Sequence, residues 1–166
     1  MNRKELIEQK KKQLYFKNLM KSIDVVMTKE IYETGDERDY YENIISSYHK
    51  LWQEGRIKPY SKLTCKATDK QCCNWIIDQS ELKCDKEYIF IKVGYYEGYA
   101  RIIFNDLFEA VLELWNHELK LNNLYSSINC GFCKGFCLID LADRKIIDVA
   151  LVSDDEENYQ LLQWYY

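Results

Sequence analysis

The cysteines come closest to a spacing that could do chemistry. Cys130 and Cys133 form a C-x-x-C pair, and Cys137 follows four residues later. Two thiolates at this spacing can bind one tetrahedral Zn²⁺, and Cys72 or Cys73, with Cys84, could supply the remaining ligands. Because no C-x-x-C pair stands in the upstream half, the competing interpretation is a set of separate, partly buried thiols. We favour the second interpretation and expect no metal or other cofactor.

The histidines give no catalytic pattern. The chain has two, His49 and His117, each within a predicted helix, and neither starts an H-E-x-x-H motif. No G-x-S-x-G elbow accompanies them, so a Ser-His-Asp assignment would be arbitrary. We expect both histidines to have structural roles.

Phosphate-binding loops are missing as well. Neither G-x-G-x-x-G nor G-x-x-x-x-G-K-S/T occurs, and Gly94 and Gly98 flank what we predict to be a hairpin turn. Nucleotide hydrolysis is therefore not expected.

Carboxylates could in principle form a two-metal nuclease site, with Asp140, Asp143 and Asp148 around one predicted hairpin. However, Asp143 belongs to a turn, and the acids at 154–157 fit the solvated start of a helix. An enzyme would need a deep pocket that gathers Asp140, Asp148 and His117. We expect a protein without catalytic residues.

Acidic and aromatic residues occur together in two segments, and this combination suits protein recognition. Tyr and Trp offer rigid contact area with a hydrogen-bonding tip, while acids steer a basic partner. The alternative is that half of these aromatics are core and that the acids keep the surface solvated. The candidate partner-binding residues are Glu33, Asp36, Glu37, Asp39, Tyr40, Tyr41, Asp154, Asp155, Glu156, Glu157, Tyr159, Trp164 and Tyr165.

Charge is distributed unevenly along the chain. Residues 1–21 hold seven basic and two acidic side chains, a net charge of +5, which leaves −9 for the rest of a chain whose net charge is −4. The acidic remainder disfavours nucleic acid and suits a basic protein partner.

The opening segment is charged where a secretory signal needs an apolar run, and no stretch is apolar for long enough to span a membrane. With an odd number of cysteines, seven, we expect reduced thiols and a cytoplasmic protein.

Apolar spacing predicts two N-terminal helices. A stripe from Phe16 to Ile31, with steps of three and four, predicts a helix over about residues 3–33. A second stripe begins at Tyr41 and ends at Gly55, a plausible C′ glycine. The two helices predict an antiparallel helical hairpin over residues 1–56.

The remaining residues, 57–166, predict an α+β body. A short helix follows a possible cap at Asp69, and β-hairpins are expected at 88–93 with 99–104 and at 135–141 with 146–152. Between them, a core helix capped by Asn105 or Asp106 extends to about Lys120. Ser153 and Glu156 fit a capping box, so the tail is either a helix or a last strand.

These elements predict a single domain, residues 1–166, of the α+β class. An N-terminal helical hairpin and a central helix would pack on an antiparallel sheet of about four or five strands.

A small, acidic, aromatic-rich α+β protein with these segments resembles the immunity proteins of bacterial toxin systems, including those of contact-dependent growth inhibition. The resemblance implies neutralisation of a basic, nuclease-type toxin by covering its active site or an essential surface. Two alternatives stay open. The protein could be a phage or mobile-element inhibitor of a host defence protein, or a small zinc-containing nucleic-acid module that uses Lys10, Lys11, Lys12 and the segment 130–137.

Overall fold

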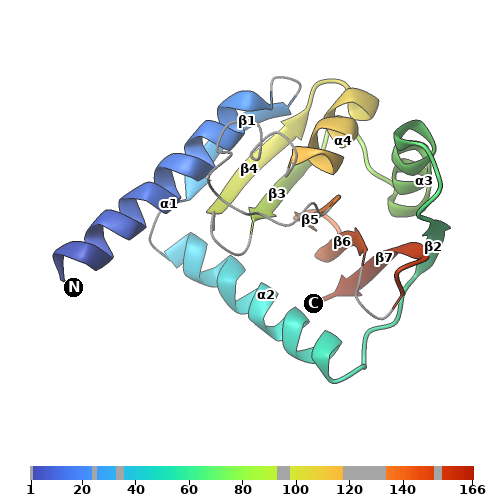
Figure 1. Ribbon diagram of the computed structural model, residues 1–166, viewed down its shortest axis with the longest axis horizontal. Helices are drawn as coiled ribbons and strands as arrows, with labels where there is room; N and C mark the ends of the chain where they lie inside the picture. Colours follow the sequence, from blue (N-terminus) through green and yellow to red (C-terminus); the bar gives the residue numbers. More distant parts are fainter. Residues whose placement is uncertain (1, 24–25, 33–35, 93–97, 118–133, 152–154) are drawn as a thin grey trace.

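The computed structural model describes residues 2–23, 26–32, 36–92, 98–117, 134–151 and 155–166. In these residues seven strands form one antiparallel sheet with the order β1-β4-β3-β5-β6-β7-β2, and helices cover both faces (Figure 1). The elements are α1 (Arg3–Ser22), β1 (Val26–Tyr32), α2 (Asp36–Gln53), β2 (Ser61–Thr64), α3 (Asp69–Ser80), β3 (Glu87–Lys92), β4 (Gly98–Phe104), α4 (Leu107–Trp115), β5 (Gly135–Asp140), β6 (Lys145–Leu151) and β7 (Asn158–Tyr165).

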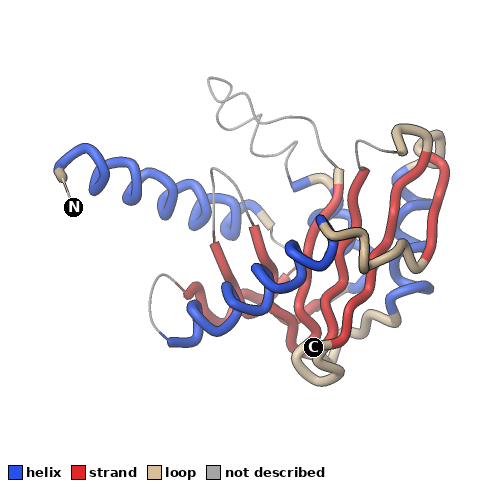
Figure 2. The backbone as a smooth tube through the Cα atoms, turned by 90° about the horizontal axis from the view of Figure 1, so that it is seen from below, coloured by secondary structure: helices blue, strands red, loops and turns tan. Residues whose placement is uncertain are grey.

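Successive strand residues point to opposite faces of the sheet, and two separate apolar cores result. On the first face, α1, α3 and α4 pack on side chains such as Phe90 and Leu138. On the second face, α2 packs on the alternate residues, among them Ile89 and Ile139. In Figure 2, α2 crosses in front of the strands. Each fully buried aliphatic or aromatic side chain stabilises the fold by about 1.5–3 kcal/mol.

The predicted helix over residues 3–33 is wrong beyond Ser22. Residues Val26–Tyr32 form an edge strand whose backbone pairs with β4, from Val26 opposite Phe104 to Tyr32 opposite Tyr99. Met27 and Ile31 are four residues apart and so match a helical stripe, but Val, Thr, Ile and Tyr also favour strands. Because β1 lies between α1 and α2 and belongs to the sheet, residues 1–56 do not form a helical hairpin.

The α+β class is confirmed, with helices packed on an antiparallel sheet, and both predicted hairpins are present as β3–β4 and β5–β6. The sheet has more strands than expected because β1 and β2 were not predicted and the tail is strand β7. The cap of α4 is Asp106, one of the two predicted residues. The cap of α3 is Thr68, whose capping box with Gln71 replaces the predicted cap at Asp69.

The predicted end of α2 is also correct. The amide of Gly55 donates to Trp52 O and that of Arg56 donates to Leu51 O, the two bonds of a Schellman motif. This motif needs a left-handed residue, and Gly55 has φ +67°. α4 spans Leu107–Trp115, and residues 118–120 of the helix predicted there lie outside the described residues, as do Ser153 and Asp154.

No helix in the described ranges is both long enough and apolar enough to cross a membrane.

Candidate partner-binding surface

Helix α2 presents the first group of predicted residues. Asp36, Glu37 and Asp39 lie in its first turn, where the helix dipole favours negative charge, and all three are exposed. Tyr40 is 51% exposed, whereas Tyr41 is 6% exposed and packs against the sheet. The two rings meet edge to face with their centroids 5.4 Å apart. The buried ring of Tyr41 therefore packs against the ring of the exposed Tyr40.

The end of β7 brings more aromatic side chains to the same place. Trp164 is half-buried. The centroid of its ring lies 6.1 Å from that of Tyr48 of α2 and 6.1 Å from that of Tyr166. Burial raises the pKa of Tyr166, and the neighbouring Tyr40 raises it further. The guanidinium of Arg144, a residue that the sequence did not suggest, lies 5.2 Å from the centre of the Tyr166 ring.

Two predicted segments, far apart in sequence, thus meet at the N-terminal end of α2. Acids on the helix lie beside one exposed tyrosine. Packed aromatic rings, among them Tyr41 and Trp164, lie between these residues and the sheet. We name this region the acid–tyrosine surface, and it consists of Asp36, Glu37, Asp39, Tyr40 and Tyr166.

Two predicted aromatic residues do not join this surface. Tyr165 is 64% exposed but points to the opposite face of the sheet from Trp164, where Lys145 Nζ lies 5.8 Å from its ring centre. Tyr159 packs edge to face on the fully buried Trp115 at 4.7 Å and belongs to the first core. Glu33 and Asp154 lie outside the described residues.

The C-terminal acids lie at the other end of α2. Asp155 accepts hydrogen bonds from Lys62 Nζ at 2.7 Å, Asn158 Nδ2 at 3.0 Å and Gln160 Nε2 at 3.4 Å. These bonds, the one from Lys62 above all, lower the pKa of Asp155 to about 2. Glu156 and Glu157 beside it are exposed. Since α2 has 18 residues and is about 27 Å long, the predicted acids form two distinct regions.

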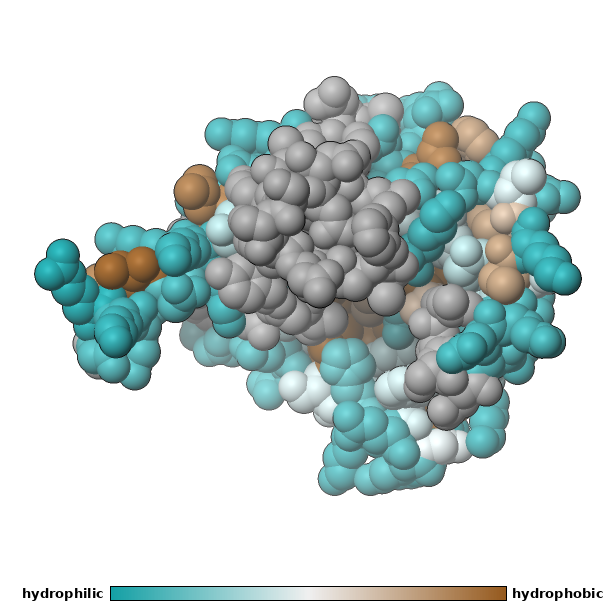
Figure 3. Space-filling model, in the orientation of Figure 1, coloured by the Kyte–Doolittle hydropathy of each residue, from teal (hydrophilic) through white to brown (hydrophobic). Residues whose placement is uncertain are grey.

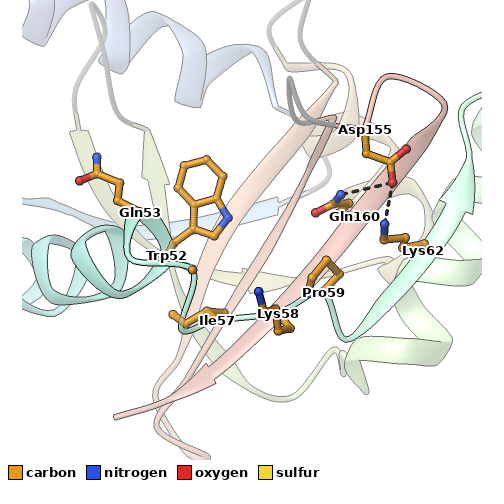
Figure 4. Close-up of a pocket in the computed structure, with 9 residues that line it drawn as sticks. Trp52, Gln53, Ile57, Lys58, Pro59, Lys62, Asp155 and Gln160 are labelled. Atoms are coloured by element: carbon orange, nitrogen blue, oxygen red, sulfur yellow. Dashed lines mark hydrogen bonds and ion pairs between the residues drawn. The ribbon is translucent and has the colours of Figure 1, made fainter.

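A groove of 570 Å³ lies between the C-terminal end of α2 and the strands β7 and β2 (Figure 4). Trp52, Ile57 and Pro59 supply its apolar wall, and the Lys62–Asp155 pair lies across from them. Trp52 is 40% exposed, so its indole ring is open to a partner. The groove therefore mixes apolar and charged groups.

Beneath α2, Tyr48 Oη donates a hydrogen bond of 2.8 Å to Asp148 Oδ2. Cys137 stands opposite Asp148 in the register of β5 and β6. Burial raises the pKa of all three groups, and for Cys137 the nearby carboxylate adds to the rise. The Cys137 thiol therefore stays protonated and is a poor nucleophile.

Among the described cysteines that were proposed as zinc ligands, Cys72 and Cys137 do not come together. Cys72 belongs to the core on the first face, whereas Cys137 packs against the core on the second, so the sheet separates them. These two residues cannot share one tetrahedral ion. Cys130 and Cys133 lie outside the described residues, and within the described part no three His, Cys, Asp or Glu side chains gather to hold a metal ion.

Asp140, Asp148 and His117 do not share a pocket either. Asp140 accepts a 3.1 Å bond from Lys86 Nζ and bonds of 3.1 Å from the amides of Ala142 and Asp143, so it organises the β5–β6 turn. His117 is buried against Phe90 on the first face, and its Nδ1 lies 2.6 Å from Leu114 O. Asp148 faces α2, on the other side of the sheet.

In the described residues the protein is a seven-stranded antiparallel sheet with three helices on one face and, on the other, one helix that presents acids and tyrosine. No protein-family model, no curated protein and no solved structure matches this chain.

Proposed function

We propose that this chain is a cytoplasmic protein-binding inhibitor, an immunity protein that neutralises a basic, nuclease-type toxin by covering its active or essential surface. The observation that carries the proposal is the acid–tyrosine surface. Three exposed carboxylates and the half-exposed Tyr40 stand on one helix, and the packing of Tyr48 on Trp164 of β7 holds that helix against the sheet.

The physics of association supports this proposal. Carboxylates concentrated on one surface raise the rate at which a basic protein finds it, and a tyrosine that is already ordered loses little entropy on binding. Aromatic residues at the centre of an interface supply much of its binding energy. Inhibition then needs only coverage of the target and no covalent step.

The test begins with a tagged chain in cells of the source organism and mass spectrometry of what co-purifies at low and moderate salt. We expect one basic protein in near-equal amount, released as the salt concentration rises. Asp36→Lys/Asp39→Lys should abolish its capture. The purified target should then lose its nuclease or toxic activity when one equivalent of wild-type chain is added.

The matched control is Asp78→Lys/Asp85→Lys, which makes the same change of net charge at two exposed acids away from α2. Capture by this control should equal capture by the wild type. If both variants lost the partner equally, general electrostatics rather than the acid–tyrosine surface would explain binding. Capture of nucleic acid alone would contradict the inhibitor proposal.

The same surface would serve a phage or mobile-element inhibitor of a host defence protein. The identity of the captured protein separates the two, since a defence factor is encoded by the host and a toxin accompanies its immunity gene.

A further inference from the structure

Strand β2 forms one edge of the sheet, and in the described part of the chain only β7 pairs with it. The amide of Cys65 donates to Glu157 O, so alternate residues counted back from Cys65 direct their backbone groups toward β7. The backbone groups of Lys62 and Thr64 therefore point outward. Because Thr64 O accepts from the amide of Ala67, the groups that face outward for a partner are both amides and Lys62 O.

The edge of a sheet is often closed by a lysine side chain, but the side chain of Lys62 does not close this one. Successive side chains of β2 point to opposite faces, and Leu63 packs on the core of the first face. Lys62 thus lies on the second face, where its Nζ donates to Asp155 at 2.7 Å. The ammonium group is therefore held away from the edge.

A groove of 560 Å³ lies between this edge and helix α3. Its helical wall includes Gln71, Asn74 and Trp75, whose spacing places them on one side of α3. Figure 1 shows β2 at the rim of the molecule beside α3, and in Figure 3 this rim exposes tan and white atoms among teal ones. The groove combines side-chain amides with apolar surface next to the outward backbone groups.

Trp75 is already fixed beside the edge. Its Nε1 donates a hydrogen bond of 2.9 Å to Ser61 Oγ, and its ring packs with Leu63 against the first core. A ring that is ordered before a ligand arrives loses little entropy on binding. The indole therefore offers a prepared apolar contact.

Of the two charged residues that line the groove, Lys66 lies beside the outward backbone groups. Its amide is 3.4 Å from Thr64 Oγ1. The other, Asp78, follows Trp75 by almost one turn of α3. Because Trp75 already contacts Ser61 at the start of β2, Asp78 lies beyond the strand. The groove next to Thr64 is therefore basic.

We propose that this groove binds an extended segment of a protein partner, which pairs with β2 as a further strand of the sheet. An extended backbone repeats its donors and acceptors every two residues, about 6.8 Å, and the amides of Lys62 and Thr64 have this spacing. In an antiparallel arrangement the segment residue opposite Lys62 exchanges two hydrogen bonds with it. The segment carbonyl two residues earlier accepts from the amide of Thr64. Such main-chain bonds supply affinity in strand addition.

The side chains of the segment follow from the groove. The residue opposite Leu63 points to the same face as Leu63, so an apolar side chain there packs on Trp75. An acidic side chain nearer the amino end of the segment reaches Lys66 and pairs with it. The segment therefore has an acidic residue that precedes an apolar one.

This inference does not rest on the proposed function, since the groove and the acid–tyrosine surface share no residue. Asp36→Lys/Asp39→Lys should bind the segment as the wild type does. Asp78→Lys/Asp85→Lys should do so too, because Asp78 lies beyond the paired residues. Failure of either proposal can thus be recognised without the other.

The test begins with a displayed library of randomised peptides, about ten residues long so that each can span a strand. Selection on the purified chain should enrich peptides in which an acidic residue precedes an apolar one. Fluorescence anisotropy then measures the binding of one labelled, enriched peptide to the wild type and to each variant.

Lys62→Pro removes the outward amide without removing a bond to β7, because proline is accepted where the amide of an edge strand faces solvent. The matched control is Lys62→Ala, which loses the same ion pair with Asp155 but keeps the amide. We expect Lys62→Ala to bind the peptide as the wild type does and Lys62→Pro to bind about tenfold more weakly. Equal binding by the two variants would overturn the proposal.

N-methylation of the peptide tests the same bonds on the unaltered protein, so it does not depend on the folding of a variant. Methylation of the amide that donates to Lys62 O should weaken binding about tenfold. Methylation of the next amide, which points away from β2, should have little effect. A sensitivity that does not alternate along the peptide would exclude strand pairing.

Lys66→Glu tests the charged contact. This change should weaken binding of the enriched peptide, and a peptide with lysine in place of its acidic residue should restore it. If no peptide were enriched on the wild type, the proposal would be wrong. It would also be wrong if the wild-type chain formed a dimer that Lys62→Pro, but not Lys62→Ala, dissociated, because the edge would then bind a second copy.

Discussion

At the scale of single residues, the Tyr48–Asp148 hydrogen bond is a polar contact buried under α2 whose strength depends on pH. Burial is the main reason that the pKa of Asp148 rises above its ordinary value of 3.8, and the Tyr48 hydroxyl opposes this rise by donating to the carboxylate. A carboxyl whose pKa is raised in the folded state stabilises the fold most at low pH. That contribution is lost as the pH rises from about 3.8 through the folded-state pKa.

Tyr48→Phe should therefore destabilise the protein in a pH-dependent way. The change removes the donor and raises the pKa of Asp148 further, so at pH 7 we expect the free energy of unfolding to fall by about 1.5–3 kcal/mol, as for a lost hydrogen bond to a charged group. The loss should shrink as the pH falls and Asp148 becomes protonated in both proteins. Urea unfolding of the two proteins between pH 7 and pH 4 measures this difference.

Tyr60→Phe is the matched control, because Tyr60 is 62% exposed and the same atom is removed there. Its effect should be within about 0.5 kcal/mol at every pH, as for surface substitutions in general. A Tyr48→Phe loss that stayed constant across the pH range would show that the hydroxyl does not stabilise the ionised carboxylate.

The sequence pointed to Asp36, Glu37, Asp39 and Tyr40 of the acid–tyrosine surface but did not show that they lie together with Tyr166. Acids in the first turn of a helix and nearby tyrosines are visible in a one-dimensional pattern, so Asp36 to Tyr41 could be predicted. That Trp164 and Tyr166 lie beside them depends on the register of β7, which no local signal encodes. Tyr159 was predicted to contact a partner, but it packs on the first core. Its burial could not be predicted, because tyrosine occurs both in cores and on surfaces.

At the scale of elements, Gly98 is what allows α1 to pack on the sheet. A Cβ added at Gly98 would overlap the ring of Phe16, which in turn stacks on Phe90 with centroids 6.4 Å apart. The sequence suggested a turn role for this glycine, but its position within β4 shows that close approach of a helix is the constraint.

Gly98→Ala should cost about 1–3 kcal/mol of unfolding free energy, because the Phe16 ring must move out of a close-packed site. Phe16→Leu alone should also destabilise, since it removes a buried ring. In the double variant the smaller leucine side chain leaves room for the added methyl group, so the combined loss should be less than the sum of the two single losses. Urea unfolding of the four proteins gives the coupling. Strictly additive losses would mean that the two residues do not compete for the same space.

Elements with their own local signals could be predicted, and those defined by distant pairing could not. The hairpins β3–β4 and β5–β6 have alternating or continuous apolar runs around short connections, and α4 has a wide apolar stripe behind Asp106. β2 is only four residues long, and its pairing partner β7 lies almost a hundred residues away. Strand β1 was predicted as helix for a different reason. The four-residue spacing of Met27 and Ile31 is compatible with one side of a helix and with one face of a strand.

At the scale of the whole molecule, the residues that form the apolar cores and the N-terminal residues that carry the excess positive charge lie in different parts of the chain. The buried residues of both apolar cores lie between Phe16 and Leu161, and residues 2–11 contribute no buried side chain to either. The projecting half of α1 is a helix of about three turns without tertiary support, and isolated helices of that length are marginal in water. Its persistence depends on continuity with the packed half and on the capping box at Asn2.

Deletion of residues 2–11 should therefore leave the body of the protein intact. We expect the free energy of unfolding, measured with urea, to change by less than about 1 kcal/mol, since no core contact is lost. The contrasting variant is Leu19→Ala in the packed half of the same helix. Leu19 is fully buried, so this change should cost about 2–5 kcal/mol. If the deletion were as costly as Leu19→Ala, the first half of α1 would have to be part of the folded body.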